Sequence, residues 1–473
     1  MNVRVRFAPS PTGFMHIGNV RVALLNYLYA RQNGGTFILR IEDTDANRNL
    51  DVARDRIIQD LKLLNLSFDE GPGIGGPYAP YLQSERNELY QKYLEQLILN
   101  CKVYRCFCTA EELELKREKQ RAMGKPPRYD RTCTHLSDDK IKAKIAANIP
   151  FVWRFRLNYD QLITINDMAK GPIHFELKNF SDFPLTRQNG TATFMFANFV
   201  DDVEMKISHV IRGEDHLSNT ALQAALYDSC GLLMPRFWHL PIICNKTGEK
   251  LSKRDFGFSL EDLVKAGYLP EAIVNYMATV GMSFQQELQS LDELVKSYPF
   301  DHLNSAAAIR YDVEKLTWFN HKWIDRLELP ALKKQIMPFF RDHFPQSTSM
   351  PKTITDALVM GIKADLKTLQ EVKEKAAFFF NAPKVTRKDL EAHMTLEKIN
   401  TACAIIKTHL TSIHAIDAFV TALKKDGQEQ GLGIKDIFGA TRFFLTGNTQ
   451  GIGIHQLIEL LGVDEAKKRL EKA

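Results

Sequence analysis

The segment Arg4-Val-Arg-Phe-Ala-Pro-Ser-Pro-Thr-Gly-Phe-Met-His-Ile-Gly-Asn-Val-Arg21 predicts a strand, a stiff loop and a helix in immediate succession. Alternation of Val3, Val5 and Phe7 is typical of a short strand. Two prolines and a glycine then exclude both a strand and a helix between residues 9 and 13. From about His16 onward, apolar side chains recur at helical spacing, which predicts a helix.

His16 stands where this arrangement would hold an anion. A loop that leads from a strand into a helix points backbone N–H groups and the positive helix end at one place. Gly18 allows close approach, and His16 adds a polar side chain. The alternative is a Rossmann-type first turn with a structural histidine. Because the loop lacks the G-x-G-x-x-G pattern, we do not expect NAD or FAD.

The composition is that of an ordinary protein with several domains. The chain has 473 residues, enough for about two to four domains. A formal net charge of +5 permits an acidic partner such as RNA without requiring one. Seven cysteines, an odd number, indicate a reducing compartment and not a disulfide framework. We find no signal peptide and no apolar run of about 18 residues, and therefore expect a cytoplasmic protein without a membrane span.

The pattern beyond the first helix predicts a parallel sheet. Asn33-Gly-Gly35 stops that helix, and Thr36-Phe-Ile-Leu-Arg-Ile41 is typical of a buried second strand. Strand, helix and strand make a βαβ unit. The acidic cluster Glu42-Asp-Thr-Asp45 follows, at the edge where open α/β sheets bind ligands. Helices are expected over residues 51–66 and 83–100.

Residues 101–190 differ in character from their surroundings. A run with seven Lys or Arg against three Asp or Glu extends from Glu114 to Arg131, and short strands are expected around 151–157, 163 and 173–177. A solvated helix face is the alternative explanation of the basic run. The α/β pattern returns after residue 191, with a helix or strand over 193–200 and strands at 207–212 and 242–244. We therefore expect an α/β insertion with a basic face.

The last part of the chain is expected to be helical. Ser259-Leu-Glu-Asp262 is a capping box, and Pro270 stands at the start of the next helix. Strand patterns almost vanish beyond about residue 325. Helical periodicity covers residues 354–380, 396–410 and 414–423, and shorter helices are expected at 434–445, 453–461 and 463–472.

A second cluster suited to phosphate chemistry is Lys250-Leu-Ser-Lys-Arg254. Three cations in five residues, between Gly248 and Gly257, form a loop able to fold over a triphosphate and neutralise charge that develops in the transition state. Such a pentapeptide alone is usually plain surface. Its combination with the His16 loop across a parallel-sheet pattern is far more specific.

In both motifs the chain resembles the class I aminoacyl-tRNA synthetases, and closely the bacterial-type glutamyl-tRNA synthetases. His16-Ile-Gly-Asn19 matches the "HIGH" signature and Lys250–Arg254 matches "KMSKS". Further blocks also agree, and are strongest over residues 1–325: Arg6–Gly13, Phe37–Asp45, Val200–Asp202, His209–Thr220 and Lys315–Asn320.

The resemblance implies a Rossmann-type, doubly wound parallel sheet with an inserted α/β domain, followed by an all-α anticodon-binding domain. The expected boundaries are 1–100 and 191–245 for the two catalytic halves, 101–190 for the acceptor-stem-binding insertion, 246–325 for a connecting helical domain and 326–473 for the anticodon-binding domain.

The resemblance also implies a glutamate–tRNA ligase that uses ATP with Mg²⁺. Glutamate and ATP would form glutamyl-adenylate and pyrophosphate, and the glutamyl group would then pass to the 3′ end of tRNA(Glu). No general base is required, because the attacking carboxylate is already an anion. A monomer is expected. The residues so implied are His16, Lys250, Lys253 and Arg254 for catalysis, His16, Gly18, Asp215 and Lys253 for ATP, and Arg6, Ser10, Glu42, Phe194, Asn198 and Arg212 for glutamate.

Two positions depart from the family pattern. Asn19 replaces a histidine in the first signature, at a position that varies among glutamate-type members. Ala192-Thr-Phe194 stands where the family usually has Pro-Thr-Tyr. Because Phe194 lacks the hydroxyl that would reach the amino acid, we expect weaker binding of glutamate, by about 0.5–1.5 kcal/mol, and not a loss of activity.

The insertion carries a candidate structural zinc site. Cys106, Cys108 and Cys133 are the expected ligands, with His135 or Tyr129 as the fourth. Some family members hold zinc at matching positions. Because C-x-C spacing is less usual than C-x-x-C, reduced thiols without metal are the alternative.

Three other functions compete with tRNA(Glu) charging. A duplicate enzyme would glutamylate mainly tRNA(Gln), and nothing in residues 326–473 excludes it. Intact His16, Lys253, Glu42 and Arg212 argue against a silent RNA-binding paralogue. A nucleotidyltransferase that does not act on RNA would leave the helical third and the basic insertion without a role. The helical third also argues against glutaminyl-tRNA synthetases and the truncated glutamyl-queuosine enzymes.

Overall fold

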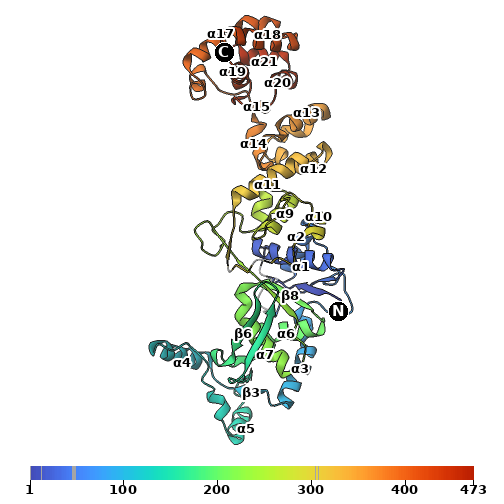
Figure 1. Ribbon diagram of the computed structural model, residues 1–473, viewed down its shortest axis with the longest axis vertical. Coiled ribbons are helices and arrows are strands. Elements are labelled where there is room, and N and C mark those ends of the chain that lie inside the picture. Colours follow the sequence, from blue (N-terminus) through green and yellow to red (C-terminus); the bar gives the residue numbers. More distant parts are fainter. Residues whose placement is uncertain (1, 12, 45–49, 304, 307) are drawn as a thin grey trace. The chain divides into compact units, whose positions relative to one another are not determined.

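The structure, a computed structural model, describes residues 2–11, 13–44, 50–303, 305, 306 and 308–473 (Figure 1). The chain divides into two compact units. Unit 1 comprises Met1–Asp262 and Val274–Val313, and unit 2 comprises Leu263–Ile273 and Glu314–Ala473. Within the described ranges, no helix is both long enough and apolar enough to cross a membrane.

Unit 1 begins with the predicted βαβ element. Strands β1 (Arg4–Phe7) and β2 (Thr36–Leu39) are parallel, with Phe7 opposite Leu39, and helix α1 (Ile17–Gln32) connects them. The apolar side chains of α1 are buried on almost every face, so this helix lies in the core and not at the surface. The buried second strand is confirmed and ends two residues earlier than expected. Asp45 of the acidic cluster lies outside the described residues.

The sheet continues through strands that are distant in sequence. The N–H of Ser208, just before β8 (His209–Gly213), donates to the carbonyl oxygen of Arg4 at 3.0 Å. Helix α7 (Leu217–Ser229) leads from β8 to the parallel strand β9 (Arg236–Leu240). On the other side of β9 lies the antiparallel hairpin β5 (Leu162–Asp167) and β6 (Gly171–Glu176). Residues of the inserted segment therefore extend the catalytic sheet.

The other elements of unit 1 cover this sheet or extend from it. Strands β3 (Val103–Cys106), β4 (Val152–Phe155) and β7 (Phe183–Pro184) form a separate antiparallel sheet, and β10 (Ile242–Cys244) pairs with β11 (Ala308–Arg310). Helices α4 (Ala110–Ala122) and α5 (Asp138–Ala146) bury no residue and lie at the outer end of the insertion (Figure 1). The basic run therefore begins on the exposed helix α4 and continues past the end of that helix to Arg131. The remaining helices here are α2 (Leu50–Leu63), α3 (Asn87–Leu99), α6 (Phe194–Glu204) and α10 (Leu291–Ser297).

Unit 2 is helical, as expected, and the described residues beyond Arg310 contain no strand. Its helices include α11 (Val313–Arg326), α12 (Leu329–His343), α13 (Lys352–Lys363), α14 (Val372–Lys375), α15 (Ala377–Phe380), α16 (Arg387–Leu390), α17 (Leu396–His409), α18 (Ile416–Glu429), α19 (Ile434–Thr446), α20 (Ile454–Leu461) and α21 (Val463–Leu470). Helices α8 (Leu260–Lys265) and α9 (Pro270–Thr279) have residues in both units.

The helical periodicity over residues 354–380 does not correspond to one continuous helix. The structure has three separate α-helices in this range. The chain leaves the helical path after α13, where the N–H of Leu369 donates to the carbonyl oxygen of Gly267 at 3.0 Å. The carboxylate of Glu371 also accepts from the N–H of Lys367. These hydrogen bonds replace the ones that a continuous helix would make, and α14 and α15 follow as short, separate helices.

Candidate active site

A cavity of about 350 Å³ lies in unit 1, at the carboxyl ends of β1 and β8. Open α/β sheets bind ligands at this edge. Of the residues expected from the sequence, nine contribute to its wall: Arg6, His16, Gly18, Glu42, Phe194, Asn198, Arg212, Asp215 and Lys250. Both sequence signatures and the glutamate-binding set therefore meet around one cavity.

Three expected residues do not line the cavity. Ser10 follows the Pro9 wall residue and is exposed. Lys253 and Arg254 lie farther along the Lys250 loop, also exposed, and neither makes an ion pair within the described part of the chain.

His16 caps the amino end of α1. Its Nδ1 accepts a hydrogen bond from the N–H of Asn19 at 3.2 Å, so the proton of the neutral ring is on Nε2. Burial, reinforced by the charge of Lys250, lowers the pKa of His16 below its ordinary value. His16 is therefore a neutral hydrogen-bond donor at the positive end of a helix.

The two signature segments are joined by backbone hydrogen bonds. The N–H of Ile17 donates to the carbonyl oxygen of Phe258 at 2.9 Å, and the N–H of Leu260 donates to that of Met15 at 2.9 Å. The ring of Phe258 stacks on His16, with centroids 5.3 Å apart. The loop that carries Lys250 is thus anchored beside the start of α1.

Lys250 is the loop cation that borders the cavity. Its Nζ lies 3.2 Å from Oδ2 of Asp215, and both side chains are more than half exposed. An ion pair this exposed is weak and can exchange for a phosphate at little cost. The loop itself is shaped by Asp255, whose carboxylate accepts from the N–H of Ser252 at 2.8 Å.

Arg6 is fixed by a buried acid. Its Nε and Nη2 donate to the two carboxylate oxygens of Asp202 at 3.1 and 3.4 Å. Arg40, fully buried, donates to the same carboxylate at 2.6 Å and to Oε1 of Glu42 at 3.2 Å. Although burial acts in the opposite direction, Arg6 and Arg40 lower the pKa of Asp202. A paired cation such as Arg6 shapes the wall more than it attracts a new anion.

Arg212 has no such partner. It is 6% exposed, and its Nη2 donates to two neutral acceptors, Oγ1 of Thr220 at 2.6 Å and Oε1 of Gln223 at 2.7 Å. Its buried Nε has no acceptor, and no carboxylate among the described residues pairs with it. Burial, followed by repulsion from Arg6, lowers the pKa of Arg212 to about 9. A buried cation with no carboxylate in direct contact, on the wall of a cavity, indicates an anionic ligand.

Side-chain hydrogen bonds connect Arg212 with the cluster of Arg6, Arg40 and Glu42. The amide of Gln223 donates to Oδ1 of Asn198 at 2.8 Å, and Nδ2 of Asn198 donates to Oε1 of Glu42 at 2.6 Å. Glu42 and Asn198 are both buried, with exposed fractions of 8% and 2%. Phe194 completes this wall, with its ring 5.8 Å from that of His216.

Sequence reasoning missed Arg40, Asp202 and Gln223. A signal was available for the first two, because Arg40 interrupts the apolar run Phe37–Ile41 and Asp202 lies in the apolar run of α6. A charge inside an apolar element requires a partner of opposite charge. Gln223 gives no comparable signal.

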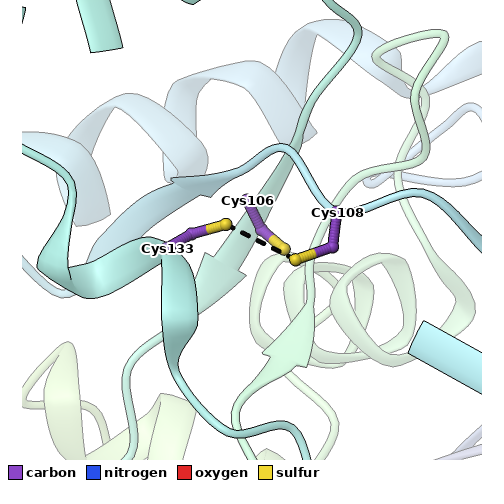
Figure 2. A group of neighbouring side chains, drawn as sticks. All are labelled: Cys106, Cys108 and Cys133. Carbon is purple, nitrogen blue, oxygen red and sulfur yellow. Dashed lines mark hydrogen bonds between the residues drawn. The ribbon is translucent and has the colours of Figure 1, made fainter. Parts of the chain in front are cut away.

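Three cysteines of the insertion converge (Figure 2). The sulfur atoms of Cys106, Cys108 and Cys133 lie within 4.8 Å of one another, and those of Cys108 and Cys133 are 3.6 Å apart. Tetrahedral zinc with Zn–S distances of about 2.3 Å would place two sulfurs about 3.8 Å apart, so the cluster fits this metal. The Tyr129 hydroxyl lies 3.3 Å from Sγ of Cys106, whereas His135 is exposed and is not part of the group.

Comparisons with known proteins agree over the whole chain. A family model described as "tRNA synthetases class I (E and Q), catalytic domain" matches residues 2–318, and one described as "Anticodon binding domain" matches residues 314–473. Relatives named glutamate–tRNA ligase include those of Sulfurihydrogenibium sp. (strain YO3AOP1), 38% identical over 99% of this chain and 98% of the relative, and Desulforudis audaxviator (strain MP104C), 37% identical over 100% and 96%.

Solved structures give the same result. The glutamate tRNA ligase of Elizabethkingia meningosepticum CCUG26117, described in complex with its amino acid, is 32% identical with a TM-score of 0.87, covering 100% of this chain and 99% of that one. The glutamate-tRNA synthetase of Elizabethkingia anophelis is also 32% identical, with a TM-score of 0.86 and the same coverage.

Proposed function

The chain belongs to the class I tRNA synthetases for glutamate and glutamine, and on this premise we propose that it is a glutamate–tRNA ligase. The observation that carries the choice of amino acid is Arg212, a buried cation on the cavity wall with no carboxylate partner. A glutamate side chain supplies the missing negative charge. Glutamine, which is neutral, leaves Arg212 uncompensated.

Glutamate would bind between Arg212 and Glu42. Its side-chain carboxylate accepts hydrogen bonds from the guanidinium of Arg212, and its ammonium group lies near the carboxylate of Glu42. Phe194 gives this wall an apolar surface in place of the hydroxyl usual in the family. Arg6, fixed by Asp202, shapes the floor.

ATP would occupy the part of the cavity near the start of α1. The Nε2–H of His16 and the backbone N–H groups at Gly18 donate to phosphate oxygens. Lys250 exchanges Asp215 for phosphate, and Lys253 and Arg254, on the same exposed loop, supply further positive charge. Mg²⁺ carried by the phosphates adds to this neutralisation.

The first step is then an in-line displacement. The α-carboxylate oxygen of glutamate attacks the α-phosphorus of ATP, and the bond to the leaving pyrophosphate breaks. The nucleophile is already ionised, so the residues need only align the two substrates and stabilise the charge that develops. The terminal ribose hydroxyl of tRNA then attacks the glutamyl carbonyl carbon, the bond from that carbon to the phosphate oxygen breaks, and AMP leaves as a phosphate oxygen takes up the hydroxyl proton.

The two units would have distinct roles toward tRNA. We propose that the basic run from Glu114 to Arg131, which begins on the exposed helix α4 of the 101–190 insertion, contacts the acceptor stem, since phosphates attract exposed Lys and Arg. Residues 326–473, within the anticodon-domain match, would contact the anticodon. We propose that the protein acts as a monomer.

We propose a structural zinc ion at Cys106, Cys108 and Cys133, with Tyr129 as the fourth ligand in preference to His135. The convergence of the sulfurs with the Tyr129 hydroxyl supports this set. Zinc there would cross-link β3 to η2 (Thr132–His135) and thereby stabilise the insertion.

Charging of purified tRNA(Glu) and tRNA(Gln) with labelled glutamate, in parallel, tests the function. Formation of glutamyl-tRNA(Glu) as the main product supports it. Charging mainly of tRNA(Gln) identifies a duplicate enzyme, and charging of neither tRNA identifies a silent paralogue.

A further inference from the structure

On the side away from the cavity, Arg212 contacts a chain of hydrogen-bonded, buried side chains, none of which lines the cavity. Oγ1 of Thr220 accepts from Arg212 at 2.6 Å and lies 2.7 Å from Nε2 of His239. Nδ1 of His239 lies 2.8 Å from Oδ2 of Asp167. Thr220, His239 and Asp167 are 0%, 0% and 4% exposed, and none of them lines the cavity.

The donors and acceptors fix a single direction along this chain. Asp167 accepts from the backbone N–H of His239 as well as from its ring, so the ring proton is on Nδ1. Nε2 is then an acceptor at 2.7 Å from Oγ1 of Thr220, and the hydroxyl proton is directed to it in preference to the more distant carbonyl oxygen of His216, at 3.1 Å. The oxygen of Thr220 is left as an acceptor for Arg212. The charge of Asp167 thus polarises each group in turn toward the guanidinium.

Asp167 stands at the end of β5, in the inserted segment, whereas Arg212 is on β8. Its other oxygen accepts from the N–H groups of Ala169 and Lys170 and forms the turn of the β5–β6 hairpin. The acid is therefore rigidly placed, two strands away from the arginine that it influences.

We propose that Thr220, His239 and Asp167 are positioning residues that orient Arg212 for the glutamate side-chain carboxylate. This inference rests on the proposed function. Thr220 and Gln223 together accept both hydrogens of Nη2, and this leaves Nη1 for the ligand, since Nε is buried. Through these hydrogen bonds the charge of Asp167 acts on Arg212 from a distance. A carboxylate directly beside Arg212 would instead compete with the substrate.

Steady-state charging of tRNA with labelled glutamate measures the effect in four variants. Thr220→Val removes the hydroxyl at constant shape, and Thr220→Ser keeps it. Asp167→Asn places an amide N–H₂ against two N–H donors of His239. Thr279→Val is the matched control, because this buried hydroxyl donates only to the carbonyl oxygen of Tyr276.

We expect Thr220→Val and Asp167→Asn to raise KM for glutamate about tenfold, with KM for ATP within about twofold of wild type. Thr220→Ser restores glutamate affinity, and Thr279→Val leaves it unchanged. A folded Thr220→Val enzyme with the wild-type KM for glutamate overturns the inference. So does an equal rise in KM for ATP.

Calorimetric titration with glutamate separates this inference from the proposed function. Wild type that binds glutamate but charges neither tRNA overturns the function alone. Equal glutamate Kd in wild type and Thr220→Val overturns the inference alone. Wild type that binds no glutamate overturns both.

Discussion

Arg212 differs from Arg40 and Arg86 in what surrounds its guanidinium, and it resembles Arg21, a second buried arginine of the cavity wall, whose Nη2 donates to the carbonyl oxygen of Val280. Arg40 and Arg86 are as deeply buried, but each lies within 2.6 Å of a carboxylate oxygen, that of Asp202 or Asp201. Those two arginines form part of the folded framework. Arg212 has only neutral acceptors, so its charge remains available to a ligand.

Phe194 is the wall residue at which we expect a gain of affinity. Phe194→Tyr restores the hydroxyl usual in the family, and one added hydrogen bond is worth about 0.5–1.5 kcal/mol. We therefore expect KM for glutamate to fall about twofold to tenfold, with KM for ATP unchanged. Steady-state charging kinetics measure both constants. An unchanged KM for glutamate would contradict the role of this position.

At the residue scale, motif spacing identified the charged groups that face the cavity and missed those behind them. His16, Glu42 and Arg212 could be predicted because substrate chemistry restricts which residues occupy a site. Gln223 could not be predicted, because a buried glutamine can hydrogen-bond to many kinds of backbone group and therefore does not by itself indicate a binding site. Ser10 matches the family pattern, but it is exposed and does not line the cavity.

The first turn of α1 couples helix stability to catalysis. A methyl group at position 18 would meet Cε1 and Nδ1 of His16 at 3.0 Å, so Gly18→Ala must displace the ring by a few tenths of an ångström. Alanine also favours the helix by about 0.5–1 kcal/mol over glycine.

We therefore expect Gly18→Ala to lower kcat while the melting temperature stays the same or rises. Thermal unfolding and ATP-dependent charging, measured on the same preparation, check the two halves of this prediction. Loss of both stability and activity would show that the backbone, and not the His16 ring, carries the effect.

The start of β8 carries a histidine that should make unit 1 sensitive to acid. The strand register places His209 beside Arg236, and burial together with that charge lowers the pKa of His209 to about 4. An unfolded chain takes up this proton near pH 6.5, whereas the folded chain does not. Stability is therefore lost as pH falls from about 6.5 to about 4, and no further below.

His209→Asn should remove this contribution. Melting temperatures of wild type and His209→Asn at about pH 7 and about pH 5 give the comparison. We expect the wild type to lose more stability than the variant across that interval. Equal losses would place the titrating group elsewhere.

The cysteine cluster between β3 and η2 yields a prediction on metal content. We expect about one zinc ion per chain after mild dialysis, and a strong reduction in Cys108→Ala. Tyr129→Phe should lower zinc retention and His135→Ala should not. Less than about half a zinc ion per wild-type chain would reject a tight site.

Element boundaries could be predicted where the periodicity is regular, as for β1, α1, α17, α19, α20 and α21. Four strands, β3, β7, β9 and β11, were not anticipated. Of these, β3 and β9 contain arginine or histidine among aromatic residues, so apolar alternation does not identify them. Pairing with β4 or β8 makes them strands, and a long-range partner cannot be seen in a local pattern.

At the scale of the whole molecule, the cavity belongs to unit 1 alone. Its wall is drawn from residues between 6 and 258, which lie on strands, on helices α1 and α6 and on loops of that unit. Activation of glutamate therefore depends on the integrity of unit 1. Unit 2, matched by the anticodon-domain model over most of its length, is where we expect selection between tRNA(Glu) and tRNA(Gln) to lie.

The central claim is that the unpaired charge of Arg212 selects glutamate, and tRNA charging by Arg212→Gln tests it most directly. Arg236→Gln, the same change at an exposed position of the same sheet, is the control. We predict that kcat/KM for glutamate falls about 10- to 100-fold in Arg212→Gln, with KM for ATP nearly unchanged and the control at the wild-type level. A folded Arg212→Gln enzyme that charges tRNA with glutamate as efficiently as wild type would contradict the account.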